Sequence, residues 1–159
     1  MTICLSPNGS TEYEVEAPVS EMLVGTIDGI ARLQRVDAAG GWQVVEQQLR
    51  GLHVGSILAE PVQGGLFAGI HGEGLYFSPD GGHTWEPRMA GLTVTHVFSL
   101  ASTRRAGGVV LYAGTEPAHL FESLDYGKSW TELPTLRQVA GLDKWTFPAP
   151  PHTGHVKGM

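Results

Sequence analysis

Apolar residues in this chain come in short runs of about five, each bounded by Gly, Pro or Asp. Such runs are typical of β-strands, because a helix would repeat its apolar positions every three or four residues instead. The segment 39–52 has some helical spacing, but it takes the place of a fourth strand, so we predict no helix. The pattern therefore predicts an all-β chain. The expected strands of the two clearest units are 54–60, 66–70, 74–78 and 84–88, then 94–101, 109–115, 119–123 and 129–133.

The expected strands fall into units that repeat along the sequence. The octapeptide "SPDGGHTW" (78–85) returns 45 residues later as "SLDYGKSW" (123–130). A weaker copy precedes both, with Gly25, Asp37 and Trp42 at the matching places. Four strands at a period of about 45 residues are what one blade of a β-propeller requires. The fold prediction is therefore a series of consecutive four-stranded β-propeller blades.

The repeat predicts a single partial β-propeller domain over residues 1–159. About three units do not close a ring, because propellers typically have about four to eight blades. The chain is then either the N-terminal part of a longer protein with six to eight blades, or one of several copies that complete a ring together. We favour the first, because an array cut within a repeat exposes a strand edge that terminal units normally protect. The expected parts are an N-terminal extension (1–20), a three-stranded first partial blade (21–50), a second blade (51–90), a third blade (91–136), and a long loop with the start of a next blade (137–159).

The repeated octapeptide is typical of a hairpin turn between the third and fourth strands of a blade. Its Asp accepts hydrogen bonds from the turn, its Gly supplies a positive φ, and its Trp buries an aromatic ring. A catalytic role for Asp80 or Asp125 is disfavoured because the same residues recur in each unit. The expected structural residues are Ser78, Asp80, Gly82, Trp85, Ser123, Asp125, Gly127 and Trp130.

The two octapeptides resemble the Asp-box, or BNR repeat, of sialidase-like β-propellers. The same repeat occurs in sortilin-type receptors, some xyloglucan-degrading hydrolases and photosystem II assembly factors. Residues 143–159, "DKWTFPAPPHTGHVKGM", are similar to a segment of bacterial BNR-repeat proteins often labelled glycosyl hydrolase-like, which implies the N-terminal part of such a protein. In sialidases these boxes lie on the outside of the propeller, away from the sugar site. The resemblance thus implies a fold and assigns no catalytic residue.

An enzyme of the sialidase type would need an arginine triad, a tyrosine nucleophile paired with a glutamate, and an aspartate acid/base. Its first arginine lies in an Arg-Ile-Pro motif, which this sequence lacks. Another hydrolase would need two carboxylates across a cleft. Glu73 and Glu116 are the best pair, because their loops should share the propeller face opposite the octapeptide turns. They are weak catalytic candidates, and the alternative is that both are solvated loop acids.

The same face is rich in histidine, and we expect His71, His119, His152 and Trp145 to be binding residues. Trp145 and Phe147 lie in a proline-rich loop that either stacks on a sugar ring or plugs the gap between blades. Neutral imidazoles are common transition-metal ligands, so a site built from His71, His119 and His152 is an alternative. No pair of histidines has the spacing of a known metal signature, however, and we predict no metal and no cofactor.

Composition and charge narrow the class of partner. The 159 residues are 42% hydrophobic and 16% charged, with 22 glycines and 10 prolines, which suits a globular chain with many turns. A net charge of −6 offers nothing to attract nucleic acid or an anionic membrane. The single cysteine, Cys4, and the lack of a signal-peptide pattern or apolar span predict a cytoplasmic protein.

Two main functions stay open at this point. The first is a non-catalytic Asp-box propeller that acts as a scaffold and binds a glycan or a protein. The alternative is a glycoside hydrolase of the sialidase-like superfamily, with most catalytic residues in blades missing from this chain. An assembly factor resembling the photosystem type is a weaker third. The expected partners are a carbohydrate or a protein, together with further blades in the same chain or in other copies of it. Propellers host unrelated functions, so the fold does not choose among these.

Overall fold

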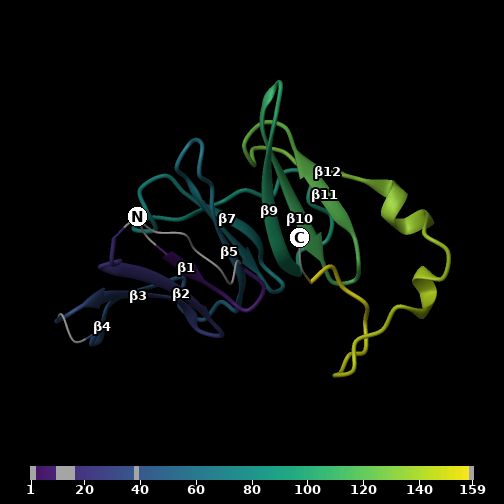
Figure 1. Cartoon of the computed structure of the whole chain (residues 1–159). Coiled ribbons are helices and arrows are strands. Elements are labelled where there is room, and N and C mark those ends of the chain that lie inside the picture. Colours follow the sequence, from purple (N-terminus) through teal and green to yellow (C-terminus); the bar gives the residue numbers. More distant parts are fainter. Residues whose placement is uncertain (1–2, 10–16, 38–39, 158–159) are drawn as a thin grey trace.

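The computed structural model of the protein describes residues 3–9, 17–37 and 40–157. These residues form three four-stranded sheets that stand side by side in chain order (Figure 1). No α-helix occurs among them, and two short 3-10 helices, Pro134–Gln138 (η1) and Leu142–Lys144 (η2), follow the last strand. The all-β prediction is therefore confirmed.

The first sheet has the strand order β1-β2-β3-β4, with β1 at Ile3–Leu5, β2 at Glu21–Thr26, β3 at Gly29–Arg35 and β4 at Trp42–Gln48. The expected three-stranded unit is thus a four-stranded sheet, because residues 3–5 of the presumed extension pair in parallel with β2. A run of three apolar residues is too short to show a period in the sequence. Tertiary burial decides its place, since the side chain of Cys4 is completely buried.

The second sheet comprises β5 (Val54–Ala59), β6 (Leu66–Ile70), β7 (Gly74–Ser78) and β8 (Glu86–Pro87). The third comprises β9 (Val97–Arg105), β10 (Gly108–Thr115), β11 (Leu120–Ser123) and β12 (Thr131–Glu132). Both sheets are antiparallel in chain order. The two inner strands 66–70 and 74–78 have the predicted bounds. The outer strand expected at 84–88 has only two residues, and Pro87 has no N–H to extend its ladder.

Two hydrophobic cores join the sheets, and the second sheet contributes to both. One core combines Leu23 and Ile30 of the first sheet with residues of β5 and β6 such as Ile57. The other combines Phe67 and Phe77 of the second sheet with residues of the third. β6 is buried along its whole length, which explains its continuous apolar sequence. Each sheet therefore depends on its neighbour for burial.

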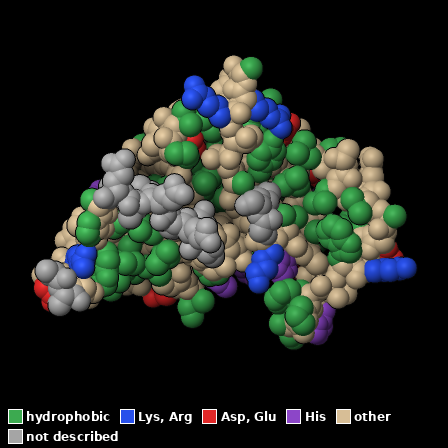
Figure 2. All heavy atoms as spheres, viewed as in Figure 1, with side chains coloured by type: hydrophobic (Ala, Val, Ile, Leu, Met, Phe, Trp, Pro, Cys, Tyr) green, Lys and Arg blue, Asp and Glu red, His purple; other side chains and the backbone are tan. Residues whose placement is uncertain are grey.

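Apolar side chains also reach the surface over the first sheet, in the lower left of Figure 2. Trp42, Val44 and Val45 of β4 are exposed, Val44 to 57%. β4 lies at the edge of its sheet. Single exposed apolar residues are ordinary, but three along one edge strand provide a surface on which another strand can pair.

Residues 134–154 leave the third sheet, carry the two 3-10 helices and return toward the sheets (Figure 1). The expected new strand near His155 is not formed, since residues 152–157 have no regular structure. Val156 nevertheless donates a backbone hydrogen bond to Thr115 (3.2 Å), and the hydroxyl of Ser99 donates to the Val156 carbonyl oxygen (2.7 Å). These bonds fix the returning segment against β9 and β10.

Candidate functional site

The two octapeptides form the β7–β8 and β11–β12 turns with closely matching hydrogen bonds. In the first, the carboxylate of Asp80 accepts bonds from the Ser78 hydroxyl (2.8 Å), the Thr84 N–H (2.9 Å) and the Thr84 hydroxyl (2.7 Å). In the second, Asp125 accepts equivalent bonds at 2.8, 2.8 and 2.6 Å from Ser123 and Ser129. Gly82 and Gly127 have φ of 90° and 78°, and the N–H of each donates to the first serine of its turn.

These turn carboxylates stay ionised. Hydrogen bonds from the backbone and hydroxyl of Thr84 hold the pKa of Asp80 well below its ordinary value. Burial alone would raise the pKa of Asp125, but the hydrogen bonds from Ser129 and Ser123 outweigh it and lower that pKa. A carboxylate with a lowered pKa is a poor proton donor at neutral pH. The geometry thus gives both residues a part in holding their turns.

The second turn also ties the third sheet to the second. Trp130 is buried to 4% exposure, and its indole N–H donates to the Arg88 carbonyl oxygen (2.9 Å). The hydroxyl of Tyr126 donates to Glu60 (3.1 Å) and accepts from the Gly65 N–H (3.1 Å). Burial raises the pKa of Tyr126 to about 12. Both aromatic residues therefore lock one sheet onto the next.

A row of four imidazoles and one carboxyl lies where the sheets meet, and we call it the histidine row. Its members, in order, are His53, His71, His96, Glu116 and His155. The His53 and His71 rings are 5.3 Å apart, and Nε2 of His71 lies 3.2 Å from Nδ1 of His96. Farther along, Nδ1 of His155 lies 3.5 Å from Oε2 of Glu116. Two backbone hydrogen bonds, from His71 to His53 and from Glu116 to His96, hold the row together.

The inner part of the row is shielded from solvent. Glu116 is 9% exposed and the His155 side chain 4%, and the buried Nδ1 atom of His155 makes no hydrogen bond within the described part of the chain. Phe98 stacks on the His155 ring at 4.3 Å. Burial, followed by the charges of His96 and His53, lowers the pKa of His71, and Glu116 opposes this effect. The neutral form of His71 is thus favoured, and a neutral imidazole is the form that ligates metals.

Sequence reasoning missed His96, although the repeat contains a signal for it. The dipeptide His-Val occurs at 53–54, 96–97 and 155–156, each time at the start of a first strand or of the matching segment. His71 and Glu116, 45 residues apart, also occupy matching positions after β6 and β10. Comparing successive units position by position would have found all five members of the row.

The alternative metal site of His71, His119 and His152 is not among the clusters that the described residues form. Nδ1 of His119 lies 2.9 Å from a Glu132 carboxylate oxygen, and Nδ1 of the exposed His152 lies 3.0 Å from the Phe147 carbonyl oxygen. Each of these histidines thus has its own local partner.

The predicted carboxylate pair is divided between two environments. Glu73 is exposed in the turn between β6 and β7. Glu116 is largely buried and faces His155. A pair of catalytic carboxyls would need both groups to border one cleft, and Glu116 borders imidazoles instead.

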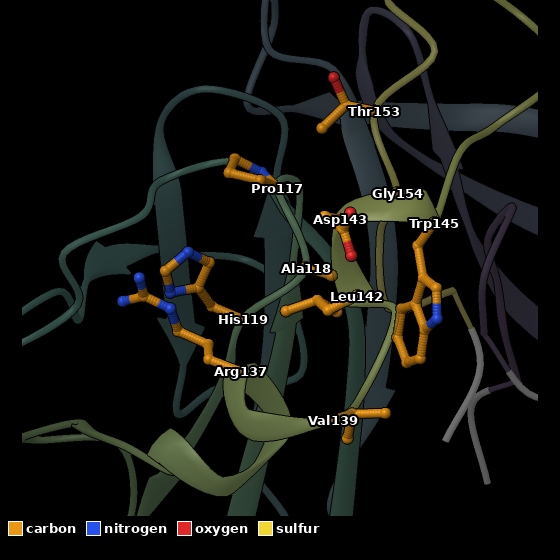
Figure 3. A pocket seen from close by; sticks show the side chains of 10 residues that line it. All are labelled: Pro117, Ala118, His119, Arg137, Val139, Leu142, Asp143, Trp145, Thr153 and Gly154. Carbon is orange, nitrogen blue, oxygen red and sulfur yellow. The ribbon is translucent and has the colours of Figure 1, made fainter.

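A second site is a cavity of about 490 Å³ between the third sheet and residues 137–154. The indole of Trp145 lies on one side of it, and the imidazole of His119 and the guanidinium of Arg137 lie on the opposite side (Figure 3). The Glu132 carboxylate contacts both His119, at 2.9 Å, and Arg137, at 3.7 Å. The remaining lining residues are Pro117, Ala118, Val139, Leu142, Asp143, Thr153 and Gly154.

The two aromatic residues of the proline-rich loop have different surroundings. Trp145 is 43% exposed at the cavity, so its ring does not fill a gap between sheets. Phe147 is half-buried, and its ring lies 4.7 Å from that of His155. Only Phe147 therefore packs in the manner expected of a plug.

Comparison with known proteins adds no relative: no protein-family model matches the chain, and no curated protein matches it. In the part of the chain that the structure describes, no helix has the length and apolar character needed to cross a membrane. The function must therefore be argued from the two sites themselves.

Proposed function

We propose that this protein is a non-catalytic scaffold of consecutive Asp-box β-propeller blades, and that the cavity beside its third sheet binds a neutral carbohydrate. The propeller arrangement is supported by three four-stranded sheets in chain order and by two matching turns 45 residues apart. The observation that carries the binding proposal is the lining of the cavity, where an exposed indole faces hydrogen-bonding side chains (Figure 3).

The lining suits a sugar for two reasons. A flat indole packs on the C–H face of a sugar ring, and Trp145 presents such a face at 43% exposure. The opposite side offers Arg137 as a donor, Asp143 as an acceptor and His119 as either, which matches the hydroxyl groups at the rim of a sugar. The volume of about 490 Å³ lies within the usual range of small-molecule sites, roughly 300 to 1,000 Å³.

Binding without turnover follows from the carboxyl groups. Most glycosidases need two carboxyls roughly 5 to 9.5 Å apart. Among the described residues that line the cavity, Asp143 alone carries a carboxyl group. Glu132 is not one of the lining residues, and its carboxylate contacts His119 at 2.9 Å and Arg137 at 3.7 Å. A sugar in this cavity would therefore be bound and released unchanged.

The test is to titrate the purified chain with a panel of neutral mono- and oligosaccharides, using calorimetry and tryptophan fluorescence. Trp145→Ala is expected to weaken binding about tenfold or more, since the loss of one stacked aromatic costs about 1.4 kcal/mol or more. Trp42→Ala is the matched control, because Trp42 is similarly exposed, at 36%, on the distant β4. Unchanged affinity in Trp145→Ala, or no binding of any sugar, would overturn the proposal. Hydrolysis of a bound oligosaccharide would favour the glycosidase alternative.

A further inference from the structure

The histidine row contains three groups that can act together on one ion. One nitrogen each from His71 and His96 and one oxygen from Glu116 all lie within 4.8 Å of one another. His71 follows β6 of the second sheet, whereas His96 precedes β9 and Glu116 follows β10 of the third. The three groups thus meet across the boundary between two sheets. This site is separate from the carbohydrate cavity, because none of these three residues lines that cavity.

The distance between the two histidine nitrogens fits a tetrahedral zinc site. Four ligands arranged tetrahedrally at Zn–N distances of about 2.0 to 2.1 Å lie about 3.3 to 3.4 Å apart. Nε2 of His71 and Nδ1 of His96 are 3.2 Å apart, and Nδ1 of His155 and Oε2 of Glu116 are 3.5 Å apart. The first separation is that of neighbouring ligands around a single zinc ion. The second places His155 beside Glu116, outside the group of three.

His155 supplies an independent observation. Its side chain is 4% exposed, and its buried Nδ1 atom makes no hydrogen bond to a described residue, although it lies 3.5 Å from Oε2 of Glu116. Buried polar atoms are nearly always hydrogen-bonded, so this nitrogen marks the place as one where a ligand is expected. His155 and His71 also border the same cavity, of about 160 Å³. The nitrogen thus lies beside the three grouped residues, through its contact with Glu116.

We propose that His71, His96 and Glu116 form a zinc-binding site that joins the second and third sheets, with His155 of the returning segment beside Glu116. Two imidazoles and one carboxylate are a ligand set that zinc commonly takes. The ring of His53 lies next to that of His71 in the row and helps to orient it. Lys157 also borders the small cavity, but its ammonium lies over the Phe147 ring, 5.8 Å from the ring centre.

Because the ligands come from two different sheets, the site exists only in the folded chain. Zinc bound there stabilises the fold that brings the ligands together. Zinc at about one hundred times its dissociation constant should raise the midpoint of thermal unfolding by about 5 to 10 °C. The inference does not depend on sugar binding, because its ligands and its readout are different.

The experiment uses the full chain, freed of metal with a chelator and titrated with zinc in competition with a chromogenic chelator. One zinc ion per chain is expected, and cobalt(II) in its place should give the intense visible bands of a tetrahedral site. His96→Ala and Glu116→Gln should each weaken zinc binding by more than about 100-fold. His119→Ala and His152→Ala are matched controls that remove histidines outside the row and should leave zinc affinity unchanged.

Two further measurements keep the outcome decisive. Circular dichroism of each metal-free variant checks that it folds, and His71→Gln, at a half-exposed position, replaces His96→Ala if that variant does not. No zinc binding by the folded chain, or equal loss of affinity in His96→Ala and His152→Ala, would overturn the proposal. Cobalt bands typical of six-coordinate water ligation would also overturn it. Loss of sugar binding in Trp145→Ala with zinc binding intact would leave both proposals standing.

Discussion

The side chains of Asp80 and Asp125 each organise a whole turn. One carboxylate collects hydrogen bonds from a serine hydroxyl ahead of it and from a backbone N–H and a hydroxyl four residues after it. These donors are fixed in place by the backbone, so they favour the charged form of the acid. This preference for the charged form lowers the pKa of each aspartate.

The lowered pKa values predict a dependence of stability on pH. A carboxyl whose pKa is lower in the folded state contributes stability above its ordinary value, 3.8 for aspartate, and loses that contribution as the pH falls through the folded pKa. We expect the free energy of unfolding to fall steadily below pH 4. The double variant Asp80→Asn with Asp125→Asn should have a lower free energy of unfolding in urea at pH 7. That free energy should also change less between pH 7 and pH 3 than it does in the unaltered protein.

Asp143→Asn is the control for this experiment, because that exposed carboxyl lies outside both turns. Its pH profile should follow that of the unaltered protein. A double variant that loses as much stability in acid as the unaltered protein would show that other groups cause the acid sensitivity.

At the scale of elements, the second and third sheets approach each other closely at Gly91. This glycine lies between β8 and β9 with φ of 81°, and a β-carbon there would stand 2.2 Å from the Trp130 carbonyl oxygen. The Trp130 N–H donates to the neighbouring Ala90 carbonyl oxygen (2.8 Å). The contact is between backbones, so a side-chain rotation cannot relieve it.

Gly91→Ala should therefore destabilise the protein more than an alanine in an open turn. Gly51 is the matched control, with φ of 79° and no atom of the described residues within 4 Å of its added β-carbon. Gly51→Ala should cost about 1 to 2 kcal/mol, from the left-handed backbone alone. Gly91→Ala should cost about 1 to 3 kcal/mol more, because the sheets must also move apart. Urea unfolding of the two variants measures the difference, and equal losses would contradict the close approach.

At the scale of the whole molecule, the second sheet links two cores into one structure. Phe67 of β6 lies in the core shared with the third sheet, and its ring is 5.2 Å from that of Tyr126 in the β11–β12 turn. Its neighbours Leu66 and Ala68 lie in the core shared with the first sheet. A disturbance on one side of β6 therefore reaches both neighbouring sheets.

Phe67→Ala should lower the free energy of unfolding by about 3 to 5 kcal/mol, because Phe67 is 1% exposed and truncation leaves a cavity. Amide hydrogen exchange should show a similar loss of protection in β2 and β3 of the first sheet and in β10 of the third, since the cores share one strand. Trp145→Ala, at an exposed position, should change stability by less than about 0.5 kcal/mol. Unchanged protection of the first sheet in Phe67→Ala would indicate that the sheets unfold independently.

Much of this architecture could be predicted from local signals. The runs at 66–70 and 74–78 have the bounds of β6 and β7, because continuous apolar runs between glycines specify buried strands. Residues 3–5 were not predicted as a strand, since their parallel pairing with β2 is a long-range contact with no local period. The prediction of a new strand near His155 was wrong, because the hydrogen bonds of Val156 fix that segment without forming a strand.

The candidate sites, too, could be predicted from the sequence only in part. Trp145 and His119 were expected as binding residues, and the fold brings them to one cavity, but Arg137 and Asp143 join them only through the path of two short 3-10 helices. His71 and Glu116 were each singled out, although for different purposes. Their meeting with His96 and His155 depends on how the sheets stand against each other, which no single unit encodes.

The sequence by itself determined the inner strands of the second sheet, the 45-residue period and the hydrogen-bonded turns, because each depends on residues close together in the chain. The tertiary structure alone decided the fourth strand of the first sheet, the composition of the large cavity and the order of the histidine row. These features join residues that are far apart in the chain. Their geometry depends on tertiary packing, such as that of Phe67 and Trp130 between the second and third sheets, and a pattern read along the chain does not record it.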